Sequence, residues 1–161
     1  MTDAAAALDA LRGRGWSLAV AESLTGGALT DAFVRVPGAS TVLVGGVVAY
    51  ATPLKASVLG VDRALLEREG PVHPGVALQM AEGVRAALAV DGLPADVGVA
   101  TTGVAGPDPQ GGRPPGTVYL AVATPNGGRT SRLDLPGDRQ AVRGGAVAAA
   151  VGLLLTVLTQ E

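Results

Sequence analysis

The stretch A-V-A-E-S-L-T-G-G, residues 19–27, decides the fold of this chain. An apolar run over residues 16–21 has the length and composition of a short buried strand, and it ends abruptly at a glutamate and a serine. Apolar residues then recur at helical spacing over residues 25–35, which predicts a helix. A strand that passes directly into a helix through two glycines is the local pattern of an α/β protein.

Helical and strand patterns continue to alternate along the chain. Helices are predicted over residues 3–13, 62–68, 74–90 and 138–158, and strands over residues 41–51, 96–103, 117–123 and 129–135. Thr2, Asp62 and Asp138 stand at the expected N-caps of three of these helices. The strand over residues 41–51 is apolar throughout, which predicts a central place in the sheet.

This order of elements predicts a three-layer α/β/α sandwich. Strands alternate with helices early in the chain, and Pro-Asn-Gly-Gly at residues 125–128 is typical of a hairpin turn between the last two strands. The sheet should therefore be mixed and mostly parallel, with one antiparallel strand. Residues 1–161 contain no internal repeat and are expected to form a single domain.

Composition excludes several classes of function. The chain has no cysteine and one histidine, so thiolate metal sites are excluded, and no metal or organic cofactor is expected. A net charge of −2 without a basic cluster argues against nucleic acid as a partner. The longest apolar run, residues 146–155, is shorter than the ~18–20 residues of a membrane span, and no signal pattern precedes it. We therefore expect a cytoplasmic protein without a membrane partner. The apolar last helix and the Gly-rich strands suggest a homo-oligomer.

Three segments should meet at the carboxyl edge of the sheet, where sites form in such folds: residues 22–27, 50–55 and 102–113. In the first, main-chain N–H groups of Thr25, Gly26 and Gly27 are expected at a helix N-terminus, where they favour an anion. Ser23 directly precedes them. It is either a nucleophile beside an oxyanion hole or an N-cap residue, and the sequence leaves both interpretations open.

Lys55 is the only lysine, whereas the other eleven basic residues are arginines. A lysine can lose its proton when it is desolvated and an arginine cannot, so Lys55 is a candidate base for Ser23 or else an ordinary surface charge. Tyr50, five residues earlier, either relays a proton and orients Lys55 or covers the core. His73 is a second candidate base or simply a helix-entry residue.

The segment T-T-G-V-A-G-P-D-P-Q-G-G, residues 101–112, is a long Gly/Pro loop. It either forms a main-chain nest for a polar or anionic ligand, with the hydroxyl of Thr102 beside it, or is a plain surface loop. Arg139 and Arg143 begin the last helix. One of them is placed to bind a phosphate, although both are equally consistent with solvated charges.

Several of these segments together resemble one known family. In chain order they are A-E-S-L-T-G-G, V-P-G-A-S, G-G-V-V-A-Y, K-A-S-V-L-G-V, M-A-E-G-V-R, T-T-G-V-A-G-P, G-T-V-Y-L-A-V and G-D-R. The chain is similar over nearly its whole length to the C-terminal domain of the CinA (competence/damage-inducible) family, which includes stand-alone nicotinamide-nucleotide amidases. Each motif is weak alone, and their order makes the resemblance specific.

The resemblance implies an α/β/α sandwich that hydrolyses the carboxamide of nicotinamide mononucleotide (NMN) to nicotinate mononucleotide and ammonia. It places the nucleophile on Ser23 and the catalytic Tyr and Lys on Tyr50 and Lys55. The expected substrate-binding residues are Thr25, Gly26, Gly27, Thr102, Gly103, Ala105, Gly106 and Arg139. No metal or cofactor is implied.

The chain also departs from the family pattern. Thr52 and Pro53 replace a usual Ser-Asn pair, His73 replaces a Ser or Thr, and residues 108–113 replace a simpler glycine run. These changes leave a second hypothesis open: a non-catalytic nucleotide-sensing or protein-interaction module that keeps the pocket. Larger family members have a further N-terminal domain. This chain begins with the helix before the first strand, so we expect it to lack that domain.

Overall fold

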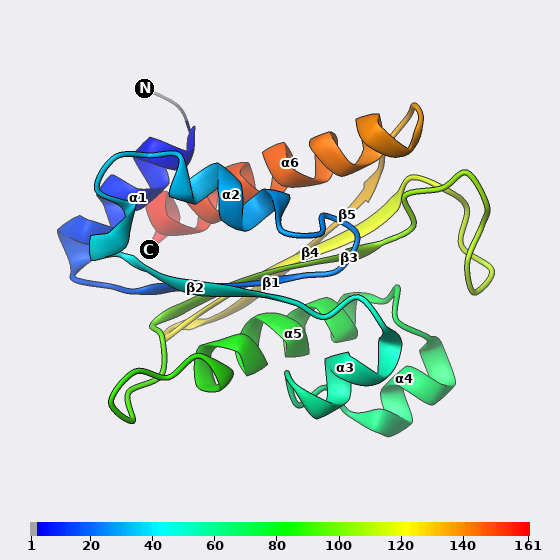
Figure 1. Cartoon of the computed structure of the whole chain (residues 1–161), viewed down its shortest axis with the longest axis horizontal. Helices are drawn as coiled ribbons and strands as arrows, with labels where there is room; N and C mark the ends of the chain where they lie inside the picture. Colours follow the sequence, from blue (N-terminus) through cyan, green and yellow to red (C-terminus); the bar gives the residue numbers. More distant parts are fainter. Residues whose placement is uncertain (1–2) are drawn as a thin grey trace.

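A five-stranded sheet forms the middle layer of the molecule in this computed structural model, which describes residues 3–161 (Figure 1). In spatial order its strands are β2 (Leu43–Val48), β1 (Leu18–Glu22), β3 (Val97–Gly103), β4 (Thr117–Thr124) and β5 (Gly127–Asp134). β1 pairs in parallel with β2 and β3, whereas β4 pairs antiparallel with both β3 and β5. Four strands therefore point one way and β4 the other, which confirms the predicted mixed sheet with one antiparallel strand.

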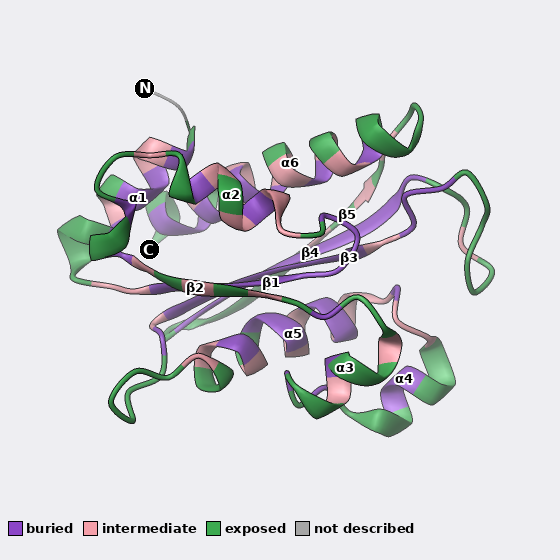
Figure 2. Cartoon of the chain, in the orientation of Figure 1, coloured by how far each residue is buried: buried purple, intermediate pink, exposed green. Residues whose placement is uncertain are grey.

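Helices cover both faces of the sheet, as the three-layer prediction requires. In the view of Figure 1, α1 (Asp3–Arg14), α2 (Ala28–Val34) and α6 (Arg139–Gln160) lie above it. The helices α3 (Thr52–Ser57), α4 (Arg63–Glu69) and α5 (Pro74–Ala87) lie below it, and a short 3-10 turn (Ala39–Thr41) precedes β2. The core has one apolar cluster on each side of the sheet, with Phe33 in the upper and Met80 in the lower (Figure 2).

The predicted caps are confirmed where the structure describes them. Asp62 accepts a hydrogen bond from the N–H of Ala64, and Asp138 accepts one from Ala141. Each carboxylate thus satisfies an N–H group that has no partner within its helix. The predicted cap Thr2 lies outside the described residues.

In the middle of the chain one prediction is wrong and one helix is missed. β2 lies at an edge of the sheet and not at its centre. A uniformly apolar run predicts burial on both faces of the strand, whereas Val44, Gly46 and Val48 are exposed. The helix α3 was not predicted, since six residues that begin at Thr52 and Pro53 are too few to show a periodic pattern.

The last helix, α6, is 22 residues long, and by length and composition it is apolar enough to cross a membrane. In the fold it lies along the upper face of the sheet beside α1 (Figure 1). Val142, Ala146 and Leu154 are fully buried there. The apolar face of α6 that contains these residues therefore forms part of the core of the domain.

Candidate active site

The hydroxyl of Ser23 and the amine of Lys55 meet at the carboxyl end of β1. The Lys55 Nζ lies 3.0 Å from the Ser23 Oγ, although the two residues are 32 positions apart. Lys55 is 1 % exposed and Ser23 is 8 % exposed. Ser23 follows directly after β1, and the chain after β2 carries Lys55 back on α3, so the parallel pairing of the two strands brings both side chains to one edge.

Main-chain carbonyls fix the position of the amine. Lys55 Nζ donates to the carbonyl oxygen of Ala49 at 2.8 Å and approaches that of Tyr50 at 3.4 Å. Burial lowers the pKa of Lys55 from its usual 10.5 to about 8, because desolvation disfavours the charged form. A substantial fraction of neutral amine is therefore available near pH 8, and a neutral amine beside a hydroxyl can accept its proton.

Glu22, the last residue of β1, holds the turn that presents Ser23. Its fully buried carboxylate accepts hydrogen bonds from the N–H groups of Gly27, Leu29 and Thr30 and from the Thr30 hydroxyl. A negative charge at a helix N-terminus is favourable, so one strand-ending side chain both caps α2 and anchors the loop. The sequence analysis missed this role. The available signal was an acidic residue placed shortly before a predicted helix start.

The two glycines of the turn serve its geometry. Gly26 has a φ of 59° and Gly27 a φ of 102°, in the left-handed region that favours glycine. The Gly27 N–H is bonded to Glu22, and the Gly26 N–H donates to the Ser23 carbonyl at 3.2 Å. The expectation that Gly26 and Gly27 offer free donors to a ligand is therefore wrong, because Glu22 and the turn itself already occupy those groups.

The free donors lie one or two positions earlier. Within residues 3–161, the main-chain N–H groups of Leu24 and Thr25 have no hydrogen-bond partner, and Leu24 lines the cleft in front of Ser23. The Thr25 side chain points elsewhere, since its hydroxyl is buried 2.8 Å from that of Thr101. Thr25 thus has an unpaired N–H, but the residue is fully buried and does not line the cleft, and its side chain packs against β3.

Arg143 of α6 also binds the main chain of this turn. Its guanidinium donates to the carbonyl oxygens of Leu24 at 2.9 Å and Thr25 at 3.1 Å. In a planar trans peptide the C=O and N–H point in opposite directions, so holding the Leu24 carbonyl also fixes the direction of the Thr25 N–H. Of the two arginines considered for phosphate, Arg143 is therefore engaged in the turn.

A cleft of about 460 Å³ opens in front of Ser23 and Lys55. Of the residues predicted to bind substrate, Thr102, Gly103, Ala105, Gly106 and Arg139 line it, whereas Thr25, Gly26 and Gly27 do not. The Thr102 hydroxyl donates to the carbonyl of Pro71 at 2.7 Å, which ties β3 to the segment before α5. The cleft thus joins the end of β1 to the long loop after β3.

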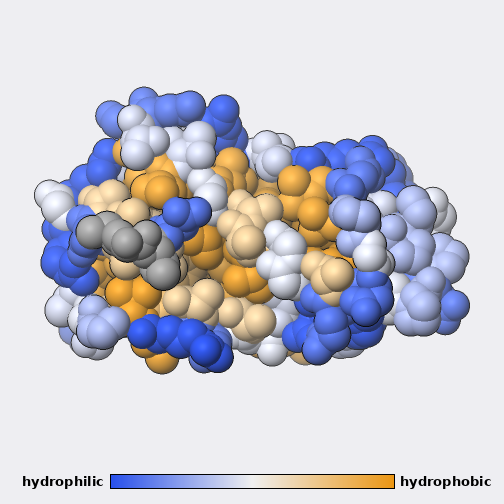
Figure 3. Space-filling view, turned by 90° about the horizontal axis from the view of Figure 1, so that it is seen from above, coloured by the Kyte–Doolittle hydropathy of each residue, from blue (hydrophilic) through white to orange (hydrophobic). Residues whose placement is uncertain are grey.

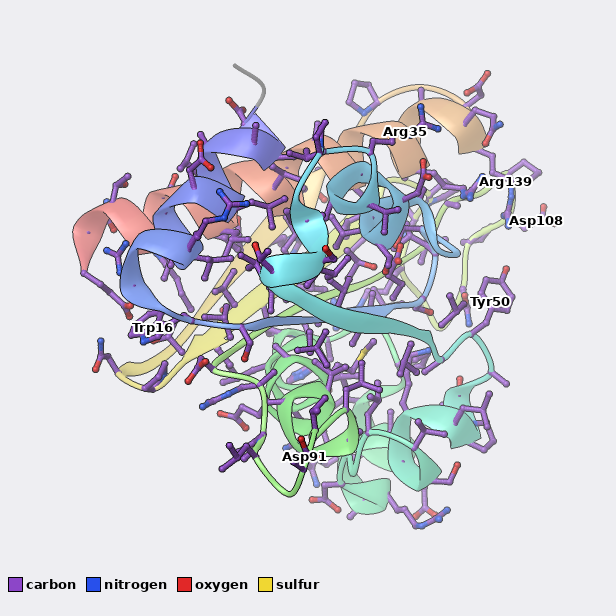
Figure 4. The ribbon with its side chains drawn as sticks, turned by 60° about the vertical axis from the view of Figure 1, so that its left-hand side comes forward. Trp16, Arg35, Tyr50, Asp91, Asp108 and Arg139 are labelled. Carbon is purple, nitrogen blue, oxygen red and sulfur yellow. The ribbon has the colours of Figure 1, made fainter. Side chains whose placement is uncertain are left out.

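Arg139 and Tyr50 form the outer wall of the cleft. The Arg139 guanidinium donates to the Gly106 carbonyl at 2.8 Å and lies 3.3 Å from the Tyr50 hydroxyl. Figure 4 shows both side chains at the same end of the molecule as Asp108. Tyr50 is 61 % exposed, so the alternative that it covers the core is wrong. The main chain of Tyr50, and not its hydroxyl, contacts Lys55.

His73 lies at the start of α5, where its Nδ1 accepts a hydrogen bond from the N–H of Gly75 at 3.0 Å. It is a helix cap, as the simpler of its two interpretations predicted, and it does not line the cleft. Within residues 3–161, no group of three or more His, Cys, Asp or Glu side chains is arranged to hold a metal ion.

The fold and the site define a class: an α/β/α domain with a buried serine–lysine pair at the carboxyl edge of a mixed sheet. Comparison with known proteins then identifies the family. It matches the CinA C-terminal domain over residues 2–158, and it belongs to that family.

Individual relatives agree with this assignment. The chain is 49 % identical over 145 residues to a CinA-like protein of Frankia casuarinae, and 49 % identical over 137 residues to a putative competence-damage inducible protein of Geobacillus kaustophilus. These matches cover 90 % and 84 % of the chain but 32 % of each relative, so the chain spans about a third of their length. A solved CinA superfamily protein of Klebsiella pneumoniae superposes with a TM-score of 0.91 at 31 % identity, covering 99 % of this chain and 97 % of that one.

Proposed function

We propose that this domain is an amidase that hydrolyses the carboxamide of nicotinamide mononucleotide, with Ser23 as nucleophile and Lys55 as base. One observation carries the proposal: a buried lysine with a lowered pKa lies 3.0 Å from a serine hydroxyl at the mouth of a cleft. Membership of the CinA family supports it, and the choice of NMN as substrate rests on the resemblance to the amidases of that family.

The first half of the reaction forms an acyl-enzyme. Neutral Lys55 takes the proton of Ser23 as the serine oxygen attacks the carboxamide carbon. The unpaired N–H of Leu24, a residue that lines the cleft, is the main-chain donor assigned to the oxyanion, and such a donor typically contributes about 3 kcal/mol. The ammonium of Lys55 then gives its proton to the leaving nitrogen, and ammonia departs.

The second half regenerates the serine. Lys55, neutral again, accepts a proton from a water molecule that attacks the acyl carbon, and it returns that proton to the Ser23 oxygen as the acid is released. Atoms and charge balance without a cofactor. Arg139 is the available cation for the phosphate of NMN, and Tyr50 positions this arginine from the cleft wall.

The test is ammonia release from NMN by the wild-type chain and by Ser23→Ala, with Ser40→Ala, a change at an exposed serine, as the matched control. We expect release by wild type and Ser40→Ala and none by Ser23→Ala, with all three melting temperatures similar. The cost of losing a catalytic serine is on the order of 10⁴-fold or more. Calorimetric binding of NMN by wild type without any ammonia release would overturn the amidase and favour the non-catalytic nucleotide-binding module.

A further inference from the structure

The direction of the Leu24 N–H, to which the proposed function assigns the oxyanion, is set through its own peptide group. In a planar trans peptide the C=O and the N–H point in opposite directions, so whatever holds the Ser23 carbonyl also orients the Leu24 N–H. The N–H of Gly26 donates to the Ser23 carbonyl at 3.2 Å. The orientation of the oxyanion donor therefore depends on the peptide group that joins Thr25 to Gly26.

Arg143 holds that second peptide group. Its guanidinium donates to the Thr25 carbonyl at 3.1 Å, and this carbonyl shares a peptide plane with the Gly26 N–H. The same guanidinium donates to the Leu24 carbonyl at 2.9 Å, so the main chain is also held on the other side of Leu24. Two planar peptide groups and one hydrogen bond therefore connect the Arg143 side chain to the N–H that is assigned to the oxyanion.

The guanidinium also brings a positive charge that no carboxylate neutralises. Among the described residues, no acidic side chain lies within ion-pairing distance of Arg143, and its side-chain partner is the neutral amide of Gln140 at 2.8 Å. The buried carboxylate of Glu22 belongs to the same turn, and its negative charge opposes the formation of an oxyanion there. The charge of Arg143 offsets that effect.

The stability of α6 does not explain a cation at this position. Arg143 lies close to the start of the helix, the end at which the helix dipole disfavours a positive charge. Seen from above, hydrophilic side chains surround the end of the molecule where α6 begins, whereas apolar residues lie along its middle (Figure 3). Arg139, the first residue of the helix, lines the cleft at this end. The position of Arg143 is therefore better explained by the turn that it contacts than by its own helix.

We propose that Arg143 is a positioning residue of the amidase reaction, which holds the main-chain N–H of Leu24 in the direction that meets the oxyanion. This role rests on the proposed function, since the oxyanion forms only if Ser23 attacks the substrate. Arg143 does not line the cleft, so its loss should slow the chemical step and leave substrate binding nearly unchanged. Removal of an oxyanion donor typically lowers kcat by about 10²- to 10³-fold, and a misdirected donor should lower it by about 10- to 100-fold.

The chain offers a matched control in Arg85, which makes the same kind of contacts at the other end of the sheet. Arg85 is also half-buried, and it donates to the carbonyls of Ala95 at 3.0 Å and Thr124 at 3.3 Å. The test compares Arg143→Met with Arg85→Met by kcat and KM for ammonia release from NMN and by melting temperature. We expect both variants to lose thermal stability, and only Arg143→Met to lose kcat. Arg143→Lys, which keeps the charge, should recover part of that kcat.

A change of one substrate atom separates positioning from a general loss of structure. In the thioamide analogue of NMN, sulfur replaces the carboxamide oxygen, and sulfur is a weak hydrogen-bond acceptor. If Arg143 acts through the Leu24 N–H, the rate penalty for the thioamide should be smaller in Arg143→Met than in wild type, because the donor is already misdirected. Arg85→Met should keep the wild-type penalty. Equal thioamide penalties in wild type and Arg143→Met would overturn the role of Arg143.

Labelling by a fluorophosphonate tests the same role without NMN. The Ser23 oxygen bonds to phosphorus, the P–F bond breaks, fluoride leaves and the serine proton passes to Lys55, while charge develops on the phosphoryl oxygen beside the Leu24 N–H. By mass spectrometry, we expect Arg85→Met to be labelled as fast as wild type and Arg143→Met at least ~10-fold more slowly. Labelling of wild type without ammonia release would overturn NMN as the substrate, and the labelling rates would then decide the role of Arg143. Equal rates for Arg143→Met and Arg85→Met would overturn that role.

Discussion

The cleft has a buried wall and an open wall, and they are built differently. On the buried wall, Lys55 donates to the Ser23 hydroxyl, and the turn that carries Ser23 is held by Glu22 and by the contact of Arg143 with the Leu24 carbonyl. On the open wall, Tyr50 is largely exposed and residues 107–112 form an exposed loop. Reactive groups need fixed geometry and low solvation, whereas a wall that admits substrate needs access. Under the proposed function, the first wall holds the reacting groups and the second wall binds the substrate.

The largest effect after loss of the serine is expected at Lys55. Lys55→Arg keeps the positive charge but cannot accept a proton, so turnover should fall by at least ~100-fold, the scale of a lost general base. The measurement is steady-state ammonia release from NMN, in which KM should change less than kcat. The control is Arg63→Lys, which exchanges the same two residue types at an exposed position and should leave kcat and KM unchanged. Wild-type turnover in Lys55→Arg would remove Lys55 from the mechanism.

A smaller effect is expected on the open wall, at Arg139. Arg139→Met removes the cation assigned to the phosphate, which should cost about 10- to 100-fold in kcat/KM, the equivalent of ~1.5–3 kcal/mol. Nicotinamide riboside, which lacks the phosphate, should be poorer than NMN by a similar factor in wild type and equally poor in the variant. Arg132→Met on β5 removes the same charge far along the sheet as a control. Equal efficiency of wild type on both compounds would show that no phosphate site exists.

The smallest effect is expected at the tip of the loop. Gln110 is exposed, and within residues 3–161 it makes hydrogen bonds only through its main chain, with Arg113. Gln110→Ala should therefore change kcat/KM by less than about threefold, as surface substitutions away from fixed contacts usually do. A loss as large as that of Arg139→Met would contradict this expectation and would show that the loop tip contacts the substrate.

The fold was predictable from sequence where local pattern and tertiary context agree. The strand before Ser23, the late hairpin and the Asp62 and Asp138 caps depend on nearby residues, and the structure confirms them. The position of β2 depends on what lies beside it in space, and a uniformly apolar strand does not reveal whether its neighbour is another strand of the same chain.

The site was predictable only where a signal is present in the sequence itself. Lys55 could be singled out because it is the only lysine, and its contact with Ser23 is present in the structure. The unpaired N–H groups were expected too late in the turn, because no local signal shows that Glu22 accepts hydrogen bonds from the N–H groups of Gly27, Leu29 and Thr30. Arg143 was not assigned to the turn, since its contacts with Leu24 and Thr25 span more than a hundred residues.

The lowered pKa of Lys55 also fixes the direction of the pH dependence. The base is active when neutral, and the neutral fraction rises as pH passes through the folded pKa of about 8. The kcat/KM of wild type should therefore increase from pH 6 to pH 9 and level off above it. A surface lysine without a catalytic role would leave this pH profile unchanged.

The most direct test of the central claim is the titration of Lys55 itself. Because the chain contains a single lysine, growth with ¹³C-labelled lysine gives one side-chain Cε signal, and its chemical shift can be followed by NMR from pH 6 to pH 12. Burial beside Ser23 predicts a midpoint near 8 in the folded protein. A midpoint at the usual lysine value of about 10.4 would contradict the account, because the amine would then be almost fully protonated at neutral pH and unable to act as the base.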